Sequence, residues 1–414
     1  MSKKLKKNVP VLRFPEFVEV LKLTYLGEIL DFKNGINAGK SQYGKGYNFI
    51  NVLDIINDAP IYYESILGSV EITEEEFLKN DVQYGDILFQ RSSEIREEAG
   101  QTNIYLDKNQ NATFGGFVIR GRPKVKFDPI YFNYLLKTQA VRKEITDRSG
   151  GSTRFNVGQN SLSEVPIFIS NSLEEQEKIA SFLGAVDTRL NQLCRKRELL
   201  QTYKRGVMQK LFSQQIRFTQ PDGSPFPDWE KKDLGDITKI YDGTHQTPNY
   251  VEKGVPFYSV EHLTSNNFTD TKFISEDIFL QEQKRVCLEK GDILMTRIGD
   301  IGTCRLIDWD VRASFYVSLA LIKANKITIS AFLAHFISSV YFQKELHKRT
   351  IHVAFPKKIN LGEIGNCQTL LPCIEEQEKI AKFQTAIDKK IEAVGQQIES
   401  MQQFKNGLLQ KMFV

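Results

Sequence analysis

Apolar residues recur at alternating steps of three and four along two long stretches of the chain. Such spacing keeps one narrow apolar stripe on one face of a helix, which is the pattern of a left-handed coiled-coil seam. It predicts long helices from Leu173 to Phe212 and from Ile374 to Phe413, packed against each other. The apolar stripe positions are Ile179, Leu183, Val186, Leu190, Leu193, Leu200, Val207 and Leu211, then Ile380, Ile387, Ile391, Val394, Ile398, Met401, Leu408 and Met412.

Four polar residues, Arg197, Lys204, Gln384 and Lys405, interrupt these stripes. Polar side chains at seam positions cost stability but fix register and partner choice. For one stretch alone, an ordinary core helix explains the pattern equally well. Because two stretches share the pattern, we favour packing of the two helices on each other.

The two helical stretches are copies of one sequence. The segment from Glu174 to Ala180 returns unchanged from Glu375 to Ala381, and the same offset of 201 residues holds to the ends of both stretches. A repeat this long does not suggest a solenoid, whose units have roughly 20–50 residues. Each copy is instead long enough for a globular domain with a helical tail. Ser172 and Glu175 predict a capping box at the start of the first helix, where the second copy has Cys373.

Upstream of the helices the two halves match only in short islands. Gly85 to Leu88 repeats as Gly291 to Leu294, and Leu26 to Ile29 matches Leu234 to Ile237. Common scaffolds with divergent loops allow one fold to bind two different targets. Strand-like runs alternate with helical patterns, so we predict an α+β domain in each half. The strand-like runs are 47–52, 86–90, 114–120 and 293–297, and the helical patterns are 130–145 and 329–346.

The N-terminal segment also has a counterpart. Phe14 and Pro15 match Phe226 and Pro227, which follow the first helix, whereas the printed sequence stops at Val414 after the second. We therefore expect the N-terminal segment to occupy, beside the second helix, the place that the linker occupies beside the first. Antiparallel pairing of the helices would then put the two domains at opposite ends of a rod.

Composition adds modest constraints. The chain has 414 residues, enough for two domains and the helices, and a formal net charge of only +4, so local basic clusters matter more than the total charge. Five cysteines without Cys-x-x-Cys spacing fit reduced thiols in a cytoplasm. There is no signal peptide and no apolar run near the ~20 residues that cross a bilayer, so we expect no membrane association.

No catalytic constellation emerges from the motifs. The segment from Gly35 to Ser41 resembles a phosphate-binding P-loop but is one residue short, and a glycine-rich stretch follows it instead of a helix. An Asn-Pro-Pro-Tyr methyltransferase motif is absent, and Glu282-Gln283-Lys284 lies too far from Pro227-Asp228 for a nuclease site. The histidines lack metal-ligand spacing. We therefore expect a noncatalytic chain without a metal or cofactor of its own.

Polar, aromatic-laced loops at corresponding places in the halves are the better candidates for base readout. Arginine bonds guanine bidentately, and asparagine or glutamine does so with adenine. Arg91 and Arg297 could equally be structural arginines held in ion pairs, and the loop around Lys40 could be a plain surface loop. The predicted DNA-binding residues are Lys40, Tyr43, Lys45, Arg91, Ser92, Arg96, Ser152, Thr153, Arg154 and Asn156, then His245, Thr247, Asn249, Tyr250, Arg297, Arg349, His352 and Lys357.

The chain resembles the specificity subunit of type I restriction-modification enzymes. The resemblance rests on the two Glu-Glu-Gln-Glu-Lys-Ile-Ala copies, each leading into a long helix and each preceded by a Gly-Asp-Ile-Leu strand, and on the segment from Asp242 to Pro248. It implies two pseudo-symmetric α/β target-recognition domains separated by an antiparallel coiled coil of two long helices. The expected boundaries are 1–171 and 214–372 for the domains and 172–213 and 373–414 for the helices.

The resemblance also implies partners. Each domain would read one half of a bipartite double-stranded DNA target, and the helices would act as a ruler that docks two methyltransferase subunits, joined by restriction subunits. S-adenosylmethionine, ATP and magnesium would then belong to the partner chains.

Two other interpretations remain open from the sequence. One is a single-chain restriction and methylation enzyme or a nuclease half, against which the missing motifs argue. The other is a coiled-coil adaptor with two protein-binding domains. An adaptor need not retain basic loops of a size to meet DNA, nor depend on salt for binding.

Overall fold

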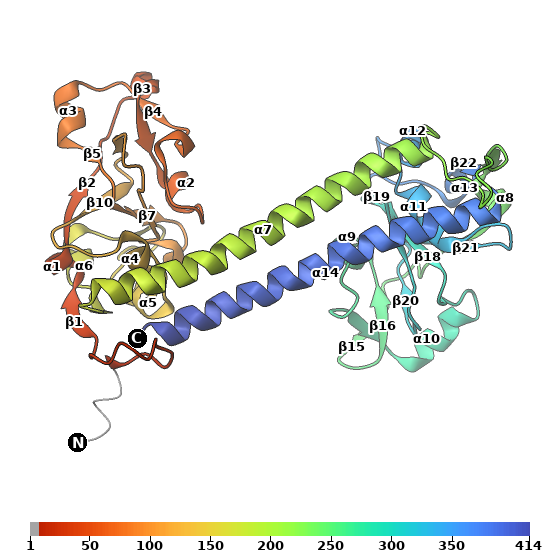
Figure 1. Cartoon of the computed structure of the whole chain (residues 1–414). Coiled ribbons are helices and arrows are strands. Elements are labelled where there is room, and N and C mark those ends of the chain that lie inside the picture. The colour runs from red at the N-terminus through yellow and green to blue at the C-terminus, as the bar shows by residue number, and fades with distance from the viewer. Residues whose placement is uncertain (1–7) are drawn as a thin grey trace. The chain divides into compact units, whose positions relative to one another are not determined.

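The computed structural model describes residues 8–414 and divides into two compact units. Unit 1 joins the described part of Met1–Leu193 to Gln397–Val414, and unit 2 is Cys194–Gln396. Each unit therefore contains one globular domain together with parts of both long helices, α7 (Leu173–Phe212) and α14 (Ile374–Met412) (Figure 1).

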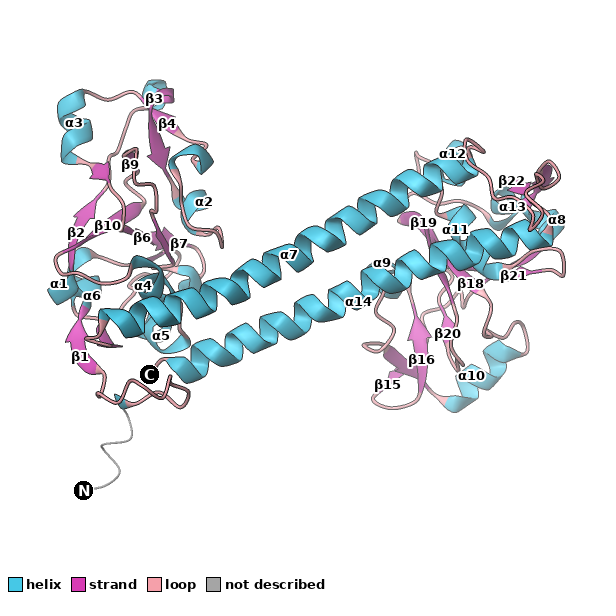
Figure 2. Ribbon diagram, viewed as in Figure 1, coloured by secondary structure: helices cyan, strands magenta, loops and turns pink. Residues whose placement is uncertain are grey.

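Unit 1 is built on two four-stranded sheets with strand orders β2-β10-β6-β8 and β4-β3-β9-β5 and on the pairs β1-β12 and β7-β11 (Figure 2). The first of these sheets, β2-β10-β6-β8, is antiparallel throughout. The strands of unit 1 are β1 (Lys22–Tyr25), β2 (Leu30–Asn34), β3 (Tyr43–Ile50), β4 (Ser69–Val70), β5 (Asp81–Val82), β6 (Ile87–Gln90), β7 (Ser92–Ser93), β8 (Thr102–Ile104), β9 (Ala112–Phe114), β10 (Val118–Pro123), β11 (Phe155–Asn156) and β12 (Pro166–Ile169). Its short helices are α1 (Leu26–Ile29), α2 (Val52–Ile55), α3 (Glu74–Lys79), α4 (Pro129–Leu136), α5 (Gln139–Asp147) and α6 (Gln159–Ser163).

Unit 2 repeats this plan with the sheet orders β14-β21-β18-β19 and β15-β17-β16-β20 and the pair β13-β22. Its strands are β13 (Glu230–Asp233), β14 (Thr238–Asp242), β15 (Tyr250–Val251), β16 (Val255–Tyr258), β17 (Lys272–Ile274), β18 (Ile293–Ile298), β19 (Asp300–Leu306), β20 (Ser314–Phe315), β21 (Leu319–Ala324) and β22 (Gln368–Leu371). Its short helices are α8 (Leu234–Ile237), α9 (Val260–Ser265), α10 (Glu276–Gln283), α11 (Ser330–Ile337), α12 (Val340–Arg349) and α13 (Leu361–Gly365). The α+β class predicted for each half is confirmed.

The repeated Gly-Asp-Ile-Leu motif has a structural explanation. Gly85 and Gly291 adopt positive φ angles of 89° and 96° in the turn before β6 and β18, a conformation that favours glycine. The aspartate that follows accepts a hydrogen bond from a backbone amide of the same turn, at 2.8 Å for Asp86 and 2.7 Å for Asp292. The motif therefore fixes the entry into a buried central strand.

Each helical pattern predicted in a domain is two helices, not one. The pattern at 130–145 divides into α4 and α5, and that at 329–346 divides into α11 and α12. The break has the same cause in both, because the hydroxyls of Thr138 and Ser339 accept backbone hydrogen bonds from Val141 and Phe342 and cap the second helix. The periodicity alone concealed this restart, since both helices bury the same kind of apolar face.

The predicted packing of the long helices on each other is confirmed. Within unit 1 the first half of α7 packs with the last turns of α14, and within unit 2 the last half of α7 packs with the first half of α14, so the two helices run antiparallel. Leu183 and Ile380 are completely buried at the predicted stripe, whereas Arg197 is exposed.

The polar interruptions of the stripe form a reciprocal pair of contacts. In unit 1 the ammonium group of Lys405 lies 2.6 Å from a carboxylate oxygen of Asp187. In unit 2 Lys204 makes the corresponding ion pair with Asp388. Because Asp187 and Asp388 are equivalent in the repeat, as are Lys204 and Lys405, these pairs specify the antiparallel register from both sides.

The duplicated Glu-Glu-Gln segment attaches each helix to its domain. The carboxylate of Glu175 binds Arg13 through two bonds of 2.6 and 2.8 Å, and Glu376 binds Arg217 through two of 3.2 and 2.8 Å. Ser172 does cap α7, accepting a 3.2 Å hydrogen bond from the amide of Glu175. The predicted capping box is nevertheless incomplete, because the Glu175 side chain turns to Arg13 and Ser170.

The N-terminal segment from residue 8 onward lies beside α14 as the linker lies beside α7, as the sequence predicted. The amide of Leu12 donates to the carbonyl of Lys411 at 2.8 Å, and that of Gln215 donates to Lys210, the equivalent of Lys411, at 2.9 Å. The contacts of Phe14 correspond to those of Phe226 only in part.

Phe14 alone makes the contacts that two linker residues share. It meets the Phe182 ring at 5.9 Å between centroids and lies under Lys178. In unit 2 the equivalent ring contact is made by Phe218, 5.8 Å from Phe383, and Phe226 lies under Lys379. Between Phe218 and Phe226 the linker forms a short hairpin, in which Thr219 and Pro225 are bridged.

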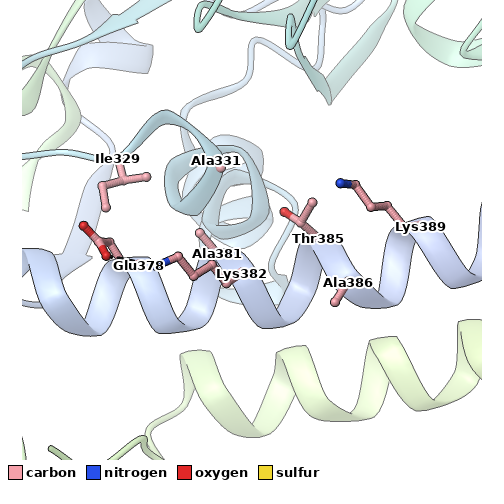
Figure 3. A pocket seen from close by; sticks show the side chains of 8 residues that line it. All are labelled: Ile329, Ala331, Glu378, Ala381, Lys382, Thr385, Ala386 and Lys389. Atoms are coloured by element: carbon pink, nitrogen blue, oxygen red, sulfur yellow. Dashed lines mark hydrogen bonds and ion pairs between the residues drawn. The ribbon is translucent and has the colours of Figure 1, made fainter.

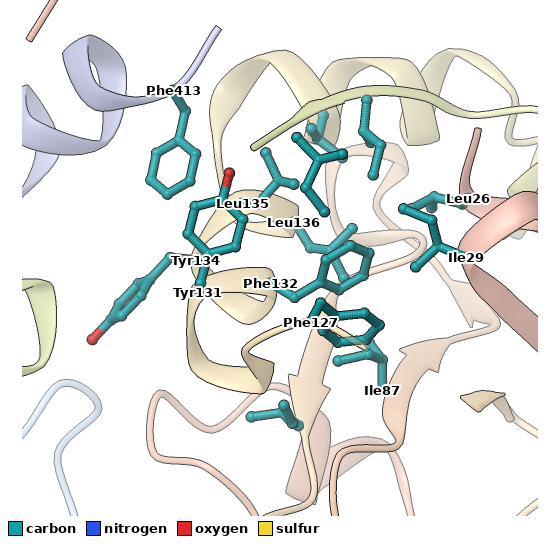
Figure 4. Packing of buried hydrophobic residues seen from close by; sticks show 14 of the residues in the cluster. Leu26, Ile29, Ile87, Phe127, Tyr131, Phe132, Tyr134, Leu135, Leu136 and Phe413 are labelled. Atoms are coloured by element: carbon teal, nitrogen blue, oxygen red, sulfur yellow. The ribbon is translucent and has the colours of Figure 1, made fainter. Parts of the chain in front are cut away.

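The core of unit 1 joins the domain to both helices (Figure 4). Phe127 and Phe132 stack at 4.4 Å between centroids inside the domain, and the Tyr131 ring contacts Phe413 at the end of α14 at 5.4 Å. Unit 2 has a corresponding cluster that includes Phe212 and Phe332. Among residues 8–414, no helix combines the length and apolar character needed to cross a membrane.

Candidate nucleic-acid interface

In unit 1 the candidate residues from two predicted loops come together around Arg91. The Arg91 carbonyl accepts a hydrogen bond from the amide of Val157, and the adjacent Ser92 pairs with Asn156 between β7 and β11. The Arg91 guanidinium donates to the carbonyl of Gly116 at 3.2 Å. Arg91 is thus bonded to backbone and, among residues 8–414, is not held in an ion pair. It joins the two loops into one surface.

This surface surrounds a hollow of about 400 Å³. Ser92 and Arg154 line it, together with Phe117, whose ring is 61% exposed, and Glu94, which lies 3.8 Å from the Arg154 guanidinium. Neither Phe117 nor Glu94 was predicted. We call Arg91, Ser92, Phe117, Arg154 and Asn156 the unit 1 patch.

The other unit 1 candidates lie around the patch or apart from it. Arg96, in the 3-10 turn Arg96–Glu98, donates to the carbonyl of Thr146, and Ser152 and Thr153 are exposed at the tip of the loop before β11. Lys40 is exposed in the turn Lys40–Gln42, which leads directly into strand β3. A helix of the kind that a P-loop needs does not follow it.

Tyr43 and Lys45 belong to β3 itself. The Tyr43 ring meets Phe49 edge to face at 5.5 Å, and Lys45 pairs with Glu71 at 2.7 Å with both side chains more than half exposed. Such an exposed pair contributes little and is readily exchanged for a phosphate. The three residues Lys40, Tyr43 and Lys45 are thus positioned by the β4-β3-β9-β5 sheet.

In unit 2 Arg297 occupies the place of Arg91. Its guanidinium donates to the carbonyls of Val317 at 3.2 Å and Ile359 at 3.5 Å, and its own carbonyl accepts from the amide of Ile359. Burial lowers the pKa of Arg297 from its ordinary value. Since Val317 in turn donates to the carbonyl of Thr244, Arg297 links the predicted loops at 244–250 and 349–357.

Thr247 and Tyr250 line a hollow of about 520 Å³ in unit 2. The Tyr316 hydroxyl lies 3.3 Å from that of Thr247, and Lys272 lies over the Tyr250 ring at 4.8 Å. Tyr316 and Lys272 were not predicted, because no motif marks them and they reach the hollow from distant strands. We call Thr247, Tyr250, Lys272, Arg297 and Tyr316 the unit 2 patch.

His245 and Asn249 lie in the same loop. The His245 imidazole is 2.6 Å from a carboxylate oxygen of Asp242, which also accepts a 2.6 Å hydrogen bond from Arg285. Partial burial raises the pKa of Asp242, but His245 and Arg285 together hold this pKa below its ordinary value. Asn249 is exposed beside Tyr250. The loop thus presents polar groups of both kinds, donors and acceptors.

The last three candidates lie at and after the end of α12. Arg349 faces Glu363 at 3.4 Å, and His352 is hydrogen-bonded to the carbonyl of His347 at 2.9 Å. Lys357 is exposed, and its carbonyl accepts a 2.8 Å hydrogen bond from Gly299 in the turn between β18 and β19. All three are therefore anchored near the end of β18 that carries Arg297.

A separate hollow of about 390 Å³ lies where α11 begins beside α14 (Figure 3). Ile329 and Ala331 face Ala381 across it, and Lys382 and Lys389 lie at its edge. Half of its lining residues are polar, and Lys382 pairs with Glu378 at 3.2 Å. In the described part of the chain, no three His, Cys, Asp or Glu side chains gather as metal ligands would.

Comparison with known proteins decides the family. The model of the type I restriction modification DNA specificity domain matches twice, at residues 15–201 and 227–403. The chain belongs to this family. Each matched region covers one globular domain and most of the long helix that follows it, so the repeat in the sequence is a repeat of the family's domain.

Similar proteins cover nearly the whole chain. The type I restriction enzyme MjaVIII specificity subunit of Methanocaldococcus jannaschii is 26% identical over 82% of this chain and 80% of its own length. The solved structure of a type I restriction-modification S subunit from M. genitalium aligns with a TM-score of 0.61 at 18% identity, covering 98% of this chain and 99% of that one. A second structure, described as concerning complex assembly and conformational transition of the type I system, aligns at 0.58 and 16% identity over 95% and 97%.

The chain is thus a noncatalytic DNA-specificity chain of a type I restriction-modification system, with two target-recognition domains. The predicted contact residues stay predictions; some of them belong to the two patches, and the others lie around the patches or apart from them.

Proposed function

We propose that each domain reads one half of a bipartite double-stranded DNA target through its patch. The observation that carries this proposal is the equivalence of Arg91 and Arg297, each of which joins two polar loops at the same end of the same central strand. Exposed Arg154 and Asn156 in one patch, and Thr247 and Tyr250 in the other, supply donors, acceptors and a stacking ring for base edges. The patches differ in residue type, so the two half-sites differ in sequence.

The paired helices set the gap between the half-sites. Groove-reading modules on one face of B-DNA favour half-sites about one helical turn apart, roughly 34–36 Å between centres. Inserting two heptads into both helices keeps the apolar seam and adds about 21 Å at 1.5 Å per residue. We expect the gap to lengthen while both half-sites stay unchanged, as read by mapping modified adenines in DNA from cells that express the chain with its methyltransferase. An unchanged gap would contradict the ruler.

Two methyltransferase subunits dock on the helices, and restriction subunits join them; S-adenosylmethionine, ATP and magnesium are held by those partners, in the cytoplasm. The docking of the methyltransferase subunits is supported by a pair of exposed aromatic rings at equivalent positions. These are Tyr203 on α7 and Phe404 on α14, which are 53% and 52% exposed. Each precedes a seam lysine, so it lies outside the seam. Half-exposed aromatic rings are common anchors of protein interfaces.

Stoichiometry tests this docking. We expect Tyr203→Ser and Phe404→Ser each to leave a complex with one methyltransferase subunit, and the double variant to leave none, as measured by native mass spectrometry. Gln201→Ser and Gln402→Ser are matched controls, because these equivalent exposed residues lie on the same helices. Retention of two methyltransferase subunits by the double variant would refute the aromatic anchors.

An adaptor that binds only proteins would behave differently with salt. If each patch meets phosphates, the logarithm of the DNA association constant falls linearly with the logarithm of salt concentration, with a slope of roughly −0.9 per phosphate contacted. We expect the purified methyltransferase complex to show this fall on specific DNA. Absence of salt-sensitive binding to DNA would favour the adaptor.

A further inference from the structure

The loop after α12 is anchored at its base and carries an unusual tip. The amide of Ile351 donates to the carbonyl of Lys358 at 2.8 Å, and the Lys357 carbonyl accepts from Gly299 at the same distance. His352 is bonded back to α12. Between these anchors Val353 and Phe355 are fully exposed, at 98% and 104%.

Exposing the whole of a phenylalanine side chain is unfavourable, because its burial stabilises a protein or a complex. Isolated exposed apolar residues are normal on a protein surface. Here, however, two stand together on an anchored tip, and one is aromatic. No residue within 8–414 covers this tip. The two side chains would therefore be buried only in contact with a binding partner.

The charge around the tip indicates which partner. Residues 348–358 include Lys348, Arg349, Lys357 and Lys358 and contain no aspartate or glutamate. Lys357 and Lys358 form no ion pair within the described residues, while Lys348 pairs with Glu345. Two free ammonium groups beside an apolar wedge complement a polyanion with apolar faces between its charges, and DNA base pairs between phosphates have that form.

The loop also emerges from the unit 2 patch. The amide of Ile359, which follows the loop directly, donates to the carbonyl of Arg297, and the Arg297 guanidinium donates to the carbonyl of Ile359. Ile298 is bridged to Lys358. The tip is thus carried by the same strand end that holds the proposed base-reading arginine. Apolar side chains inserted between base pairs unstack them and kink the duplex by roughly 20–90°.

Unit 1 has the same loop with a different tip. Gly150 and Asn156 are bridged as Ile351 and Lys358 are, and Val157 donates to Arg91 as Ile359 donates to Arg297. Its tip residues are Ser152 and Thr153, which are polar. The backbone frame is shared, and only the second domain carries a wedge.

We propose that Phe355, with Val353 beside it, inserts between two adjacent base pairs of the half-site that the second domain reads, while Lys357 and Lys358 hold the flanking phosphates. The inserted ring unstacks one base step. The half-site read by the first domain receives no inserted side chain. This proposal rests on the proposed function of the second domain as a DNA reader.

The test uses the full chain in complex with its methyltransferase and duplexes carrying the mapped bipartite target. Fluorescent base analogues, 2-aminopurine for adenine and pyrrolocytosine for cytosine, replace one base at a time in both half-sites. The adenine modified in each half-site is left unsubstituted, because methyltransferases flip their target base out of the stack. At the remaining positions we expect fluorescence to rise on binding at one step of the second half-site and at none of the first. Phe355→Ser abolishes the rise and weakens binding by about tenfold, the loss of one stacked ring.

Two further variants make the result specific. Phe355→Trp keeps a ring and retains the rise. Leu67→Ser is the matched control, since Leu67 is 95% exposed in the first domain, and it changes neither fluorescence nor affinity. A rise that persists in Phe355→Ser, or no rise in the unsubstituted complex, overturns the wedge.

Failure of the wedge is distinguishable from failure of the proposed function. A duplex with a scrambled second half-site is bound in parallel. Weaker binding of the scrambled duplex shows that the second domain reads sequence, and the fluorescence result then decides the wedge alone. Equal binding of both duplexes overturns the proposed function, and the wedge with it.

Discussion

Tyr134 in unit 1 and His335 in unit 2 stand at equivalent positions of the repeat, each beside a lysine and aspartate pair of the helical seam. The Tyr134 hydroxyl donates a 2.6 Å hydrogen bond to Asp187. The His335 imidazole lies 3.8 Å from the Asp388 carboxylate and 3.4 Å from the Thr385 hydroxyl. The same frame thus holds a group that stays neutral over the working pH range in one half and a titratable base in the other.

The seam itself shows a second difference. Leu183 in unit 1 and Gln384 in unit 2 are equivalent and both completely buried. Neither polar atom of the Gln384 amide has a hydrogen-bond partner among residues 8–414. The two halves therefore share a backbone plan but differ in the stability of their junctions between domain and helix, and unit 2 should be the weaker.

The largest effect is expected from moving the unit 2 defect into unit 1. Leu183→Gln removes a buried aliphatic side chain and buries an amide without partners, which should lower the free energy of unfolding of unit 1 by roughly 3–5 kcal/mol. Urea denaturation followed by circular dichroism measures it. Leu199→Gln, on an exposed part of α7, is the control and should change stability by less than about 0.5 kcal/mol. Equal effects of the two substitutions would show that the seam does not stabilise unit 1.

An intermediate effect should come from acid. Burial, and then Lys204, lower the pKa of His335 to about 4, against the opposing influence of Asp388. Because the unfolded histidine titrates near 6.5, the unfolded state binds more protons between these values, and unit 2 loses stability as the pH falls through that window. Linkage gives a loss of about 2 kcal/mol between about pH 7.5 and pH 5.

His335→Tyr should remove that sensitivity, since unit 1 carries tyrosine at the equivalent position. Denaturation at the two pH values compares the variant with the unsubstituted chain, and the difference for unit 1 serves as the internal control. If the variant loses as much stability in acid as the parent does, another group is responsible.

A smaller gain should follow from repairing the seam of unit 2. Gln384→Leu replaces an unpartnered buried amide by the side chain found in unit 1, which should raise the unfolding free energy by about 1–2 kcal/mol. Thermal unfolding measures the gain as a higher midpoint for unit 2 alone. A loss of stability would mean that the Gln384 amide is satisfied in solution, by water.

The smallest effect concerns the ion pair beside His335. Lys204→Met removes the cation that helps to depress the pKa of His335, so this pKa should rise while burial still holds it below the ordinary value. A proton NMR titration of the imidazole follows it. Lys405→Met, at the equivalent place in unit 1, should leave the His335 titration unchanged. A shift of the same size in both variants would contradict the local origin of the effect.

The helical frame was predictable because its determinants are local and repeated. The three-four spacing and the two copies at one offset gave the long helices, their packing and the place of the N-terminal segment. The ion pair of Arg13 with Glu175 was not predictable, since it joins residues 162 positions apart. The division of α4 from α5 was hidden because the Thr138 cap lies inside a continuous apolar period.

The candidate site was predictable only as residue types. Loops rich in Arg, Asn, Ser and Tyr indicated the segments that contribute to the two patches, but the direction of a guanidinium depends on carbonyls supplied by distant strands. Arg297 turns to Val317 and Ile359 for that reason. Tyr250 was predicted, but two other aromatic members of the patches, Phe117 and Tyr316, were not, because their position follows from sheet topology and leaves no mark on the sequence.

The central claim is that two domains on one repeated frame each read their own half-site. The most direct measurement exchanges residues 16–165 for the corresponding domain of a relative with a different target and then maps modified adenines in DNA from cells that express the hybrid with its methyltransferase. We predict that one half-site changes to that of the relative while the other half-site and the gap remain. A change in both half-sites together would contradict the claim.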